Sequence, residues 1–337
     1  MRCTNKRLKR FISLFLAGTV CCVTLGGCSL EKAPEDAFTV DRSGFGIQDQ
    51  GADLDISYFA EDLCVAAEDE SAVDTEIEDA LAACFFDLDT KEILYAKNIH
   101  DKVFPASTTK IMTALLLLEN GDLDAQAVVS KDAVTFHESG VTTVKLKEGD
   151  VLTLRQLLYA LLLVSANDAA NVIAEKIGGS TEQFVGMMNE KAAKIGATNT
   201  HFMNPHGLHD EEHYTTAYDL YLMFQEAMKY DTFLEVLQVP SWDTSYVAAD
   251  GKEITASWSS SNRFTKGDVT VPDGITAVGG KTGTTKAAMS CLVQLFEDGE
   301  GHRYVAIIVG CSERAVLYEE MQSFLNAIQP QEEPEES

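Results

Sequence analysis

Three short motifs, widely separated along the chain, most constrain the fold, because their side chains must meet if they act together. The segment S-T-T-K at 107–110 comes first, S-A-N at 165–167 follows, and K-T-G-T at 281–284 lies near the end. One S-x-x-K segment is common by chance, but the ordered set of S-x-x-K, S-x-N and K-T-G is not. The fold must therefore bring a helix start, a polar turn and a strand to one site.

The first motif supplies a candidate nucleophile, Ser107, and a candidate general base, Lys110. The apolar run Ile111 to Leu118 follows, so Ser107 is expected at the start of a buried helix. A helix N-terminus offers free N–H groups and a positive dipole end, which stabilise an oxyanion. Lys110 shares a helix face with Ser107, and in a dry cleft near another cation it loses its proton readily. Alone, the motif is more typical of an N-cap serine and a solvated lysine.

The second motif is expected between two helices, at the end of a leucine-rich helix and the start of another at Asp168. Ser165 is a candidate proton relay between Lys110 and a leaving amine. Asn167 is a candidate hydrogen-bond partner for the substrate amide. By itself the segment is also typical of a polar turn.

The third motif follows Gly279-Gly280 and is predicted on an inner strand of the sheet. Gly283 allows a substrate backbone to approach closely. Lys281 supplies positive charge for a substrate carboxylate and for lowering the pKa of Lys110, and the hydroxyls of Thr282 and Thr284 are candidate ligands of that carboxylate. The backbone N–H of Thr284 is a candidate oxyanion donor beside that of Ser107. The alternative without a catalytic role is that this segment is a β-turn.

Strand patterns lie at both ends of this region and helix patterns lie between them. Leu81–Phe86 and Ile93–Ala96 form one predicted hairpin, Ala288–Phe296 and Tyr304–Val309 form another, and Thr276–Val278 leads into a further strand. Capping boxes at 153–156 and 180–183 open two helices. Apolar stripes mark a third helix around 220–228 and a closing one around 317–328. The fold class is therefore α/β (α+β): one antiparallel sheet flanked by helices, with an inserted helical subdomain at about 112–235 and the site where the two parts meet.

The N-terminus resembles an export signal. Five basic residues precede an apolar stretch from Phe11 to Leu25, which is short for a membrane span, and Leu25-Gly26-Gly27-Cys28 resembles the bacterial lipobox. We expect a signal at 1–27 and a lipidated Cys28; an ordinary signal with an incidental cysteine is the alternative.

An acidic tether at 28–56, a catalytic domain at 57–330 and an acidic tail at 331–337 are expected to follow. The net charge of −27 argues against nucleic acid as a partner. Once the signal is removed, four cysteines besides Cys28 remain: Cys64, Cys84, Cys291 and Cys311. Free buried thiols are favoured for them, although adjacent strands could pair two.

The motifs and their surroundings resemble the penicillin-binding serine D-Ala-D-Ala carboxypeptidases over about residues 80–328. The resemblance includes F-P-A-S-T-T-K-I-M-T at 104–113, S-A-N-D-A-A at 165–170, F-M-N-P-H-G-L at 202–208 and H-Y-T-T-A at 213–217. It implies that Ser107 attacks peptidoglycan stem peptides ending in D-Ala-D-Ala and releases the terminal D-Ala, and that water then hydrolyses the acyl-enzyme. It also implies that β-lactam antibiotics acylate the same serine and that no metal or cofactor is needed.

One departure from the family concerns the anchor. Many members carry a C-terminal β-rich domain and an amphipathic anchoring helix, for which this chain leaves no room after its closing helix. A lipid on Cys28 would replace that anchor and hold the exported enzyme on the outer face of the bacterial cytoplasmic membrane, facing the cell wall.

Three alternatives stay open. A class A β-lactamase shares two motifs, but its middle motif is usually Ser-Asp-Asn and position 166 here is Ala, with no evident glutamate-bearing loop. A zinc peptidase would use the cluster His201, His206, His209 and His213, which lacks H-E-x-x-H; a structural loop is favoured. A non-catalytic cell-wall-binding lipoprotein of the same fold is the third.

Overall fold

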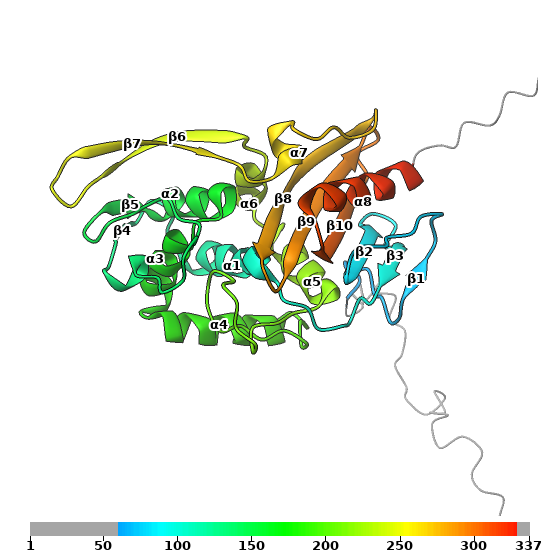
Figure 1. Cartoon of the computed structure of the whole chain (residues 1–337), viewed down its shortest axis with the longest axis horizontal. Helices are drawn as coiled ribbons and strands as arrows, with labels where there is room; N and C mark the ends of the chain where they lie inside the picture. The colour runs from blue at the N-terminus through cyan, green and yellow to red at the C-terminus, as the bar shows by residue number, and fades with distance from the viewer. Residues whose placement is uncertain (1–59, 329–337) are drawn as a thin grey trace, which may run out of the picture. The chain divides into compact units, whose positions relative to one another are not determined.

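The computed structural model describes residues 60–328. The predicted signal, Cys28, the whole acidic tether and the acidic tail lie outside this range. Within it, both ends of the chain contribute to one antiparallel sheet of six strands in the order β1-β3-β2-β10-β9-β8 (Figure 1). The strands are β1 (Glu70–Ser71), β2 (Ala82–Asp87), β3 (Ile93–Lys97), β8 (Ile275–Thr285), β9 (Met289–Asp298) and β10 (Arg303–Cys311). The predicted hairpins β2–β3 and β9–β10 are confirmed.

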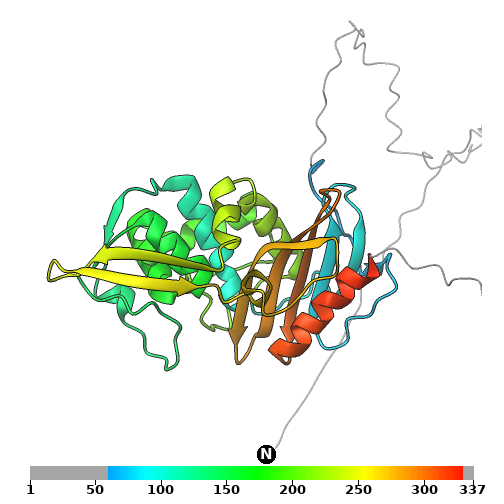
Figure 2. The same ribbon diagram turned by 90° about the horizontal axis from the view of Figure 1, so that it is seen from above.

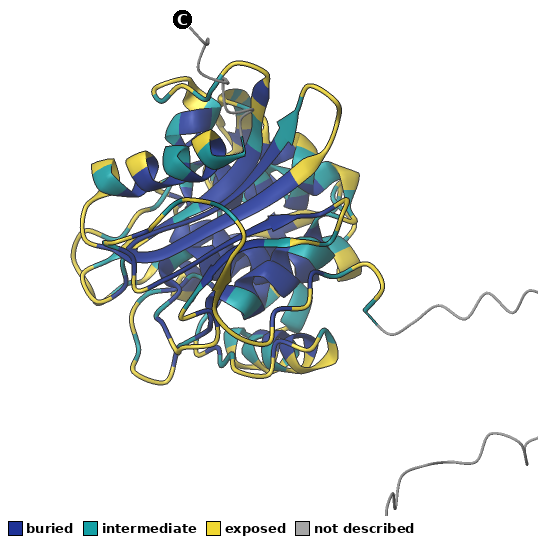
Figure 3. Ribbon diagram, turned by 90° about the vertical axis from the view of Figure 1, so that its right-hand side faces the viewer, coloured by how far each residue is buried: buried dark blue, intermediate teal, exposed yellow. Residues whose placement is uncertain are grey.

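The central strands are buried on both faces (Figure 3). Successive side chains of a strand point to opposite faces, so Phe85 and its neighbour Phe86 belong to different cores. Phe85 stacks on Phe324 of the closing helix α8 (Arg314–Ala327), with ring centroids 5.0 Å apart. Phe86 packs against Tyr221 of α5 (Ala217–Ala227) on the other side. The sheet thus lies between α8 and the helical part, as the predicted fold class requires.

The helical part lies in sequence between β3 and β8. Its helices are α1 (Lys110–Asn120), α2 (Leu154–Tyr159), α3 (Asn167–Gly178), α4 (Thr181–Lys194), α5 and α6 (Asp231–Leu237). The capping box of Thr153 and Gln156 opens α2 as predicted, and Ser180 accepts a hydrogen bond from Gln183 N–H at the start of α4. These helices bury most of the apolar residues whose spacing predicted them.

A second sheet of four strands was not predicted. It contains β4 (Gln126–Val128), β5 (Val151–Thr153), β6 (Ser241–Val247) and β7 (Glu253–Ser259), in that order. The β6–β7 hairpin runs along the helical part, and its turn reaches away from the six-stranded sheet (Figures 1 and 2). Trp242 and Trp258 face each other across it, and Trp242 stacks on Tyr159 at 4.0 Å. This stack fastens the base of the hairpin to α2.

One prediction about the sheet is wrong. The K-T-G-T segment does not lie on an inner strand, because β8 is the edge of the six-stranded sheet and pairs only with β9 in the part of the chain described. The backbone of β8 therefore keeps one unpaired side. The four cysteines Cys64, Cys84, Cys291 and Cys311 are free and buried. Between residues 60 and 328, every helix is too short or too polar to span a bilayer.

Candidate active site

The candidate nucleophile lies on a tight turn that leads into α1. Residues Ala106–Thr109 form a short 3-10 helix, and Lys110 begins α1 directly afterwards, so Ser107 lies at the helix start as predicted. Ala106 has a φ of 48°, a left-handed conformation that costs a non-glycine residue about 1–2 kcal/mol. The serine side chain itself is only partly buried. The turn thus presents a hydroxyl at the end of a helix that is otherwise deep in the core.

Lys110 is fully buried, and its ammonium group contacts three oxygen atoms. Its Nζ lies 3.1 Å from Ser107 Oγ, 2.7 Å from Asn167 Oδ1 and 2.5 Å from the carbonyl oxygen of His206. Burial lowers the pKa of Lys110 well below the ordinary lysine value, the charge of Lys281 lowers it further, and Asp168 opposes the shift. The predicted influence of Lys281 on Lys110 agrees with this geometry.

The second motif lies between two helices, as expected. After α2 the chain widens into a π-helical turn, Ala160–Val164, and Ser165 then takes the left-handed conformation with φ of 66°. Asn167 begins α3, which points its amide oxygen at Lys110. The hydroxyl of Ser165 accepts a hydrogen bond from Lys281 Nζ at 2.9 Å. Ser165 is therefore joined directly to the third motif; its relay to Lys110 stays a prediction.

The third motif lies along the edge strand β8. Lys281 is fully buried, and burial, helped by the charge of Arg314, lowers its pKa to about 7. Gly283 passes so close to the nucleophile turn that a Cβ there would lie 2.9 Å from the Pro105 carbonyl oxygen and 3.1 Å from Ser107 N. The hydroxyl of Thr282 lies 2.8 Å from that of Ser261, while Thr284 is exposed. All three motifs therefore meet around Ser107.

Two participants were missed from the sequence. Arg314, the first residue of α8, is exposed and donates a hydrogen bond to Thr284 Oγ1 at 3.2 Å. The sequence did carry a signal for Arg314: a cation at a helix N-terminus is unfavourable beside the positive end of the helix dipole, so its presence there indicates another role. The other is the backbone carbonyl of His206, which no side-chain pattern could reveal. Asp168, next to Asn167, holds the 144–146 segment by accepting hydrogen bonds from Val144 and Leu146.

The histidine cluster that was considered as a zinc site instead forms hydrogen bonds within the protein. His213 bonds to Thr109, and His201 bonds to the carbonyl of Glu212. Within the described residues, no three His, Cys, Asp or Glu side chains are arranged to hold a metal ion.

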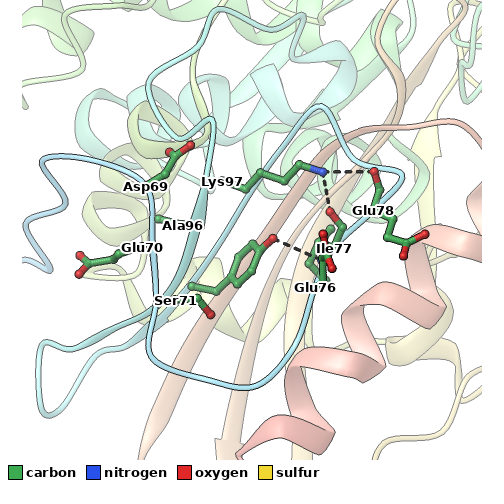
Figure 4. A pocket seen from close by; sticks show the side chains of 9 residues that line it. Asp69, Glu70, Ser71, Glu76, Ile77, Glu78, Ala96 and Lys97 are labelled. Carbon is green, nitrogen blue, oxygen red and sulfur yellow. Dashed lines mark hydrogen bonds between the residues drawn. The ribbon is translucent and has the colours of Figure 1, made fainter.

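A hollow of about 530 Å³ lies elsewhere, beside β1 and β3 (Figure 4). There Lys97 donates to the carbonyl of Ile77, and no motif residue lines it.

Comparisons with known proteins identify the family of this chain. The family model described as D-alanyl-D-alanine carboxypeptidase matches residues 68–312. The chain is 34% identical to the D-alanyl-D-alanine carboxypeptidase DacF of Bacillus subtilis, over 69% of this chain and 58% of that protein. It is 34% identical to DacB2 of Mycobacterium tuberculosis, over 66% of this chain and 72% of that one. The match thus spans less than two thirds of the length of DacF.

A solved structure extends the likeness to three dimensions. The crystal structure of a Streptomyces DD-transpeptidase superposes with a TM-score of 0.68 at 30% identity, covering 74% of this chain and 96% of that chain. The predicted fold class is therefore confirmed. The chain belongs to the D-alanyl-D-alanine carboxypeptidase family.

Proposed function

We propose that this protein is a serine-type D-Ala-D-Ala carboxypeptidase that removes the terminal D-Ala from peptidoglycan stem peptides through an acyl-enzyme on Ser107. The observation that carries the proposal is the contact between Ser107 Oγ and a fully buried Lys110 whose other two partners are carbonyl oxygens. The roles that follow for the remaining residues rest on this pair.

Lys110 acts as the general base. Its partners Asn167 Oδ1 and the His206 carbonyl oxygen can only accept hydrogen bonds, whereas the Ser107 hydroxyl can also donate. An uncharged amine has two N–H groups for the two carbonyl oxygens and one lone pair for the hydroxyl. Burial and the Lys281 charge favour that uncharged form. The lone pair of Lys110 then takes the serine proton as Oγ attacks the carbonyl carbon of the penultimate D-Ala.

The developing oxyanion is stabilised by backbone N–H groups. Ser107 N lies at the start of α1, where helix N–H groups have no partner within the helix. Thr284 lies on the edge strand β8, one residue beyond Gly283, which lies against Ser107 N. We assign the backbone N–H groups of Ser107 and Thr284 as the oxyanion hole, because fixed donors there stabilise the charge that forms on the carbonyl oxygen.

Ser165 serves as the relay that returns a proton to the leaving nitrogen. The C–N bond breaks, D-Ala departs as a free amine, and water later hydrolyses the Ser107 ester. Lys281 fixes the Ser165 hydroxyl by donating to it. The left-handed conformation of Ser165 is a strain expected at a functional position.

The substrate's terminal carboxylate is recognised beside β8. We assign the hydroxyls of Thr282 and Thr284, both on β8, as ligands of that carboxylate, and Arg314 supplies a guanidinium through its contact with Thr284. Lys281 lies deeper and adds positive charge, while Asn167 is placed for the substrate amide. This site requires a free C-terminus, which is what distinguishes a carboxypeptidase substrate, and the same arrangement accepts a β-lactam carboxylate.

We further propose that the protein is exported and held at the membrane by a lipid on Cys28, with an acidic tether at 28–56 ahead of a catalytic domain at 57–330. The basic n-region, the apolar stretch and the L-G-G-C segment support this assignment. The helical subdomain at about 112–235 is the part of that domain that carries Ser165 and Asn167.

Release of D-alanine tests the activity. The chain from Ser29 is incubated with a synthetic peptide ending in D-Ala-D-Ala and with its L-Ala-L-Ala counterpart. We expect D-alanine from the first peptide only, and none from Ser107→Ala, which keeps the fold. Hydrolysis that persists in Ser107→Ala would contradict the assignment.

A further inference from the structure

Apart from the His206 carbonyl, the mechanism above makes no use of residues 201–216, here called the histidine loop. It returns on itself through the antiparallel pair His201–Tyr214 and joins the segment before the nucleophile through Val103–Thr215. Asn189 of α4 holds Phe202 through both backbone groups. The histidine loop is therefore a fixed element that lies against the nucleophile turn.

The loop touches the nucleophile turn at more than one point. The carbonyl of His206 binds Lys110, as described. Gly207 has a φ of +85°, and a Cβ at this position would lie 1.8 Å from the Ala106 carbonyl oxygen. Thr113 of α1 donates to the carbonyl of Pro205 at 2.6 Å. The loop thus packs onto the backbone just before Ser107 without a gap for any side chain at 207.

His213 completes this contact through a directional chain of hydrogen bonds. Met203 N–H donates to His213 Nδ1 at 3.0 Å, so the proton of the neutral ring is on Nε2. Nε2 then donates to Thr109 Oγ1 at 2.8 Å, and Thr109 Oγ1 donates to the Ala106 carbonyl oxygen at 2.8 Å. His213 is 2% exposed, and burial lowers its pKa to about 4, which keeps the ring neutral.

This chain of hydrogen bonds ends at Ala106, which, like Ser165, has a strained backbone. Ala106 has a positive φ, and such a conformation persists only where the surroundings hold it. Its carbonyl is held by Thr109 and covered by Gly207. Rotation of the Ala106 peptide would turn the following residue, Ser107, away from Lys110.

We propose that His213 is a positioning residue for the nucleophile: through Thr109 it holds the Ala106 carbonyl and thereby the direction of the Ser107 hydroxyl. It is not a catalytic residue, because its ring bonds to Met203 and Thr109 and to neither Ser107 Oγ nor Lys110 Nζ. The inference rests on the proposed function, since it concerns how readily Ser107 is acylated.

Two amide substitutions at position 213 distinguish the contributions of the two ring nitrogens, Nδ1 and Nε2. His213→Gln places an N–H near the position of Nε2, whereas His213→Asn keeps only an acceptor near Nδ1. The acylation rate constant at saturating benzylpenicillin and the dissociation constant of the non-covalent complex are measured for each. Misplacing a reacting group by about 1 Å costs roughly 100-fold in rate, so we expect His213→Asn to lower the rate constant about 10- to 100-fold. His213→Gln should retain most of it, and the dissociation constant should change little in either.

Thr109 provides a second test that keeps side-chain volume. Thr109→Val removes the hydroxyl and should slow acylation as much as His213→Asn, whereas Thr109→Ser should restore it. Because His213 and Thr109 act through the same chain of hydrogen bonds, the double variant His213→Asn/Thr109→Val should be acylated no more slowly than Thr109→Val alone. His100, which binds the carbonyl of Ala66 and packs on Tyr218, is the matched control: His100→Asn should acylate at the wild-type rate.

The outcomes separate the two claims. Equal rates for His213→Asn and His213→Gln, multiplied losses in the double variant, or a wild-type rate in Thr109→Val would overturn the role of His213 while leaving the proposed function intact. Failure of the wild-type protein to form any adduct would instead overturn the proposed function, and this inference with it.

Discussion

At the scale of single residues, the site is built from two lysines that are both fully buried. Taking an ammonium group out of water disfavours its charged form, so both pKa values fall. Neither Lys110 nor Lys281 forms an ion pair with a carboxylate among the described residues; their hydrogen-bond partners are hydroxyl, amide and carbonyl oxygens. The protein thus accepts a cost in stability for a lysine that is able to act as a base.

The base assignment predicts that Lys110→Arg is not acylated. Arginine keeps a positive charge and a long stem, but its pKa is too high for it to release its proton in a protein. Mass spectrometry after exposure to benzylpenicillin checks this. Lys191→Arg, at a partly buried ion pair of α4 away from the motifs, is the control and should acylate normally. A Lys110→Arg adduct forming at the wild-type rate would refute the assignment.

The buried charge also predicts how stability depends on pH. The pKa of Lys281 is about 7 in the fold and near 10.4 in the unfolded chain, so the unfolded state binds more protons between those values and stability rises with pH there. Lys281→Met removes this penalty, which is on the order of a few kcal/mol. We expect the variant to raise the unfolding temperature more at pH 6 than at pH 9.5. An equal gain at both pH values would contradict a lowered pKa.

At the scale of elements, the sequence predicted strands correctly where they are apolar runs, and missed strands that are short or have mainly polar exposed residues. The hairpins β2–β3 and β9–β10 were predicted from apolar runs around turn residues, and the structure confirms them. Strands β4 and β5 have only three residues each, and the exposed face of β6–β7 is mainly Ser, Thr, Asp and Glu. The turn around Asp250-Gly251 was the signal that could have revealed that hairpin.

The place of β8 in the sheet shows a different limit. A strand's sequence reports how its two faces are buried, but its rank in the sheet depends on which strands pair from far along the chain. Lys281 and Gly283 are buried although β8 is an edge strand, because the nucleophile turn and the helical part cover them. Likewise, Arg314 and the His206 carbonyl join the site only through tertiary packing, so the motifs alone could not include them.

The junction of α2 and α3 gives a prediction at this scale. Ser165 is left-handed, and a non-glycine residue there costs about 1–2 kcal/mol. Ser165→Gly should therefore be more stable than Ser165→Ala by about 1 kcal/mol, although both lose the hydroxyl and should turn over substrate poorly. Urea unfolding of the two variants measures the difference. If Ser165→Ala were the more stable, the strained junction would not exist in solution.

At the scale of the whole molecule, the chain carries a net charge of −27, yet its first ten residues hold five basic side chains. That contrast is typical of an export signal ahead of an acidic extracytoplasmic protein. We predict that Cys28 carries lipid, so Cys28→Ala should leave the protein soluble outside the cell rather than in the membrane fraction. Labelled palmitate that fails to enter the wild-type protein, while the protein reaches the medium, would exclude the anchor.

The central claim is that the three motifs assemble one acylating serine, and the mass of the intact protein tests it most directly. The soluble chain from Ser29 is mixed with excess benzylpenicillin, and its mass is followed with time and mapped by peptide digestion. We predict a persistent one-to-one adduct on Ser107. An adduct lost within seconds, with catalytic consumption of penicillin, would indicate a β-lactamase, and the absence of any adduct would contradict the proposed site altogether.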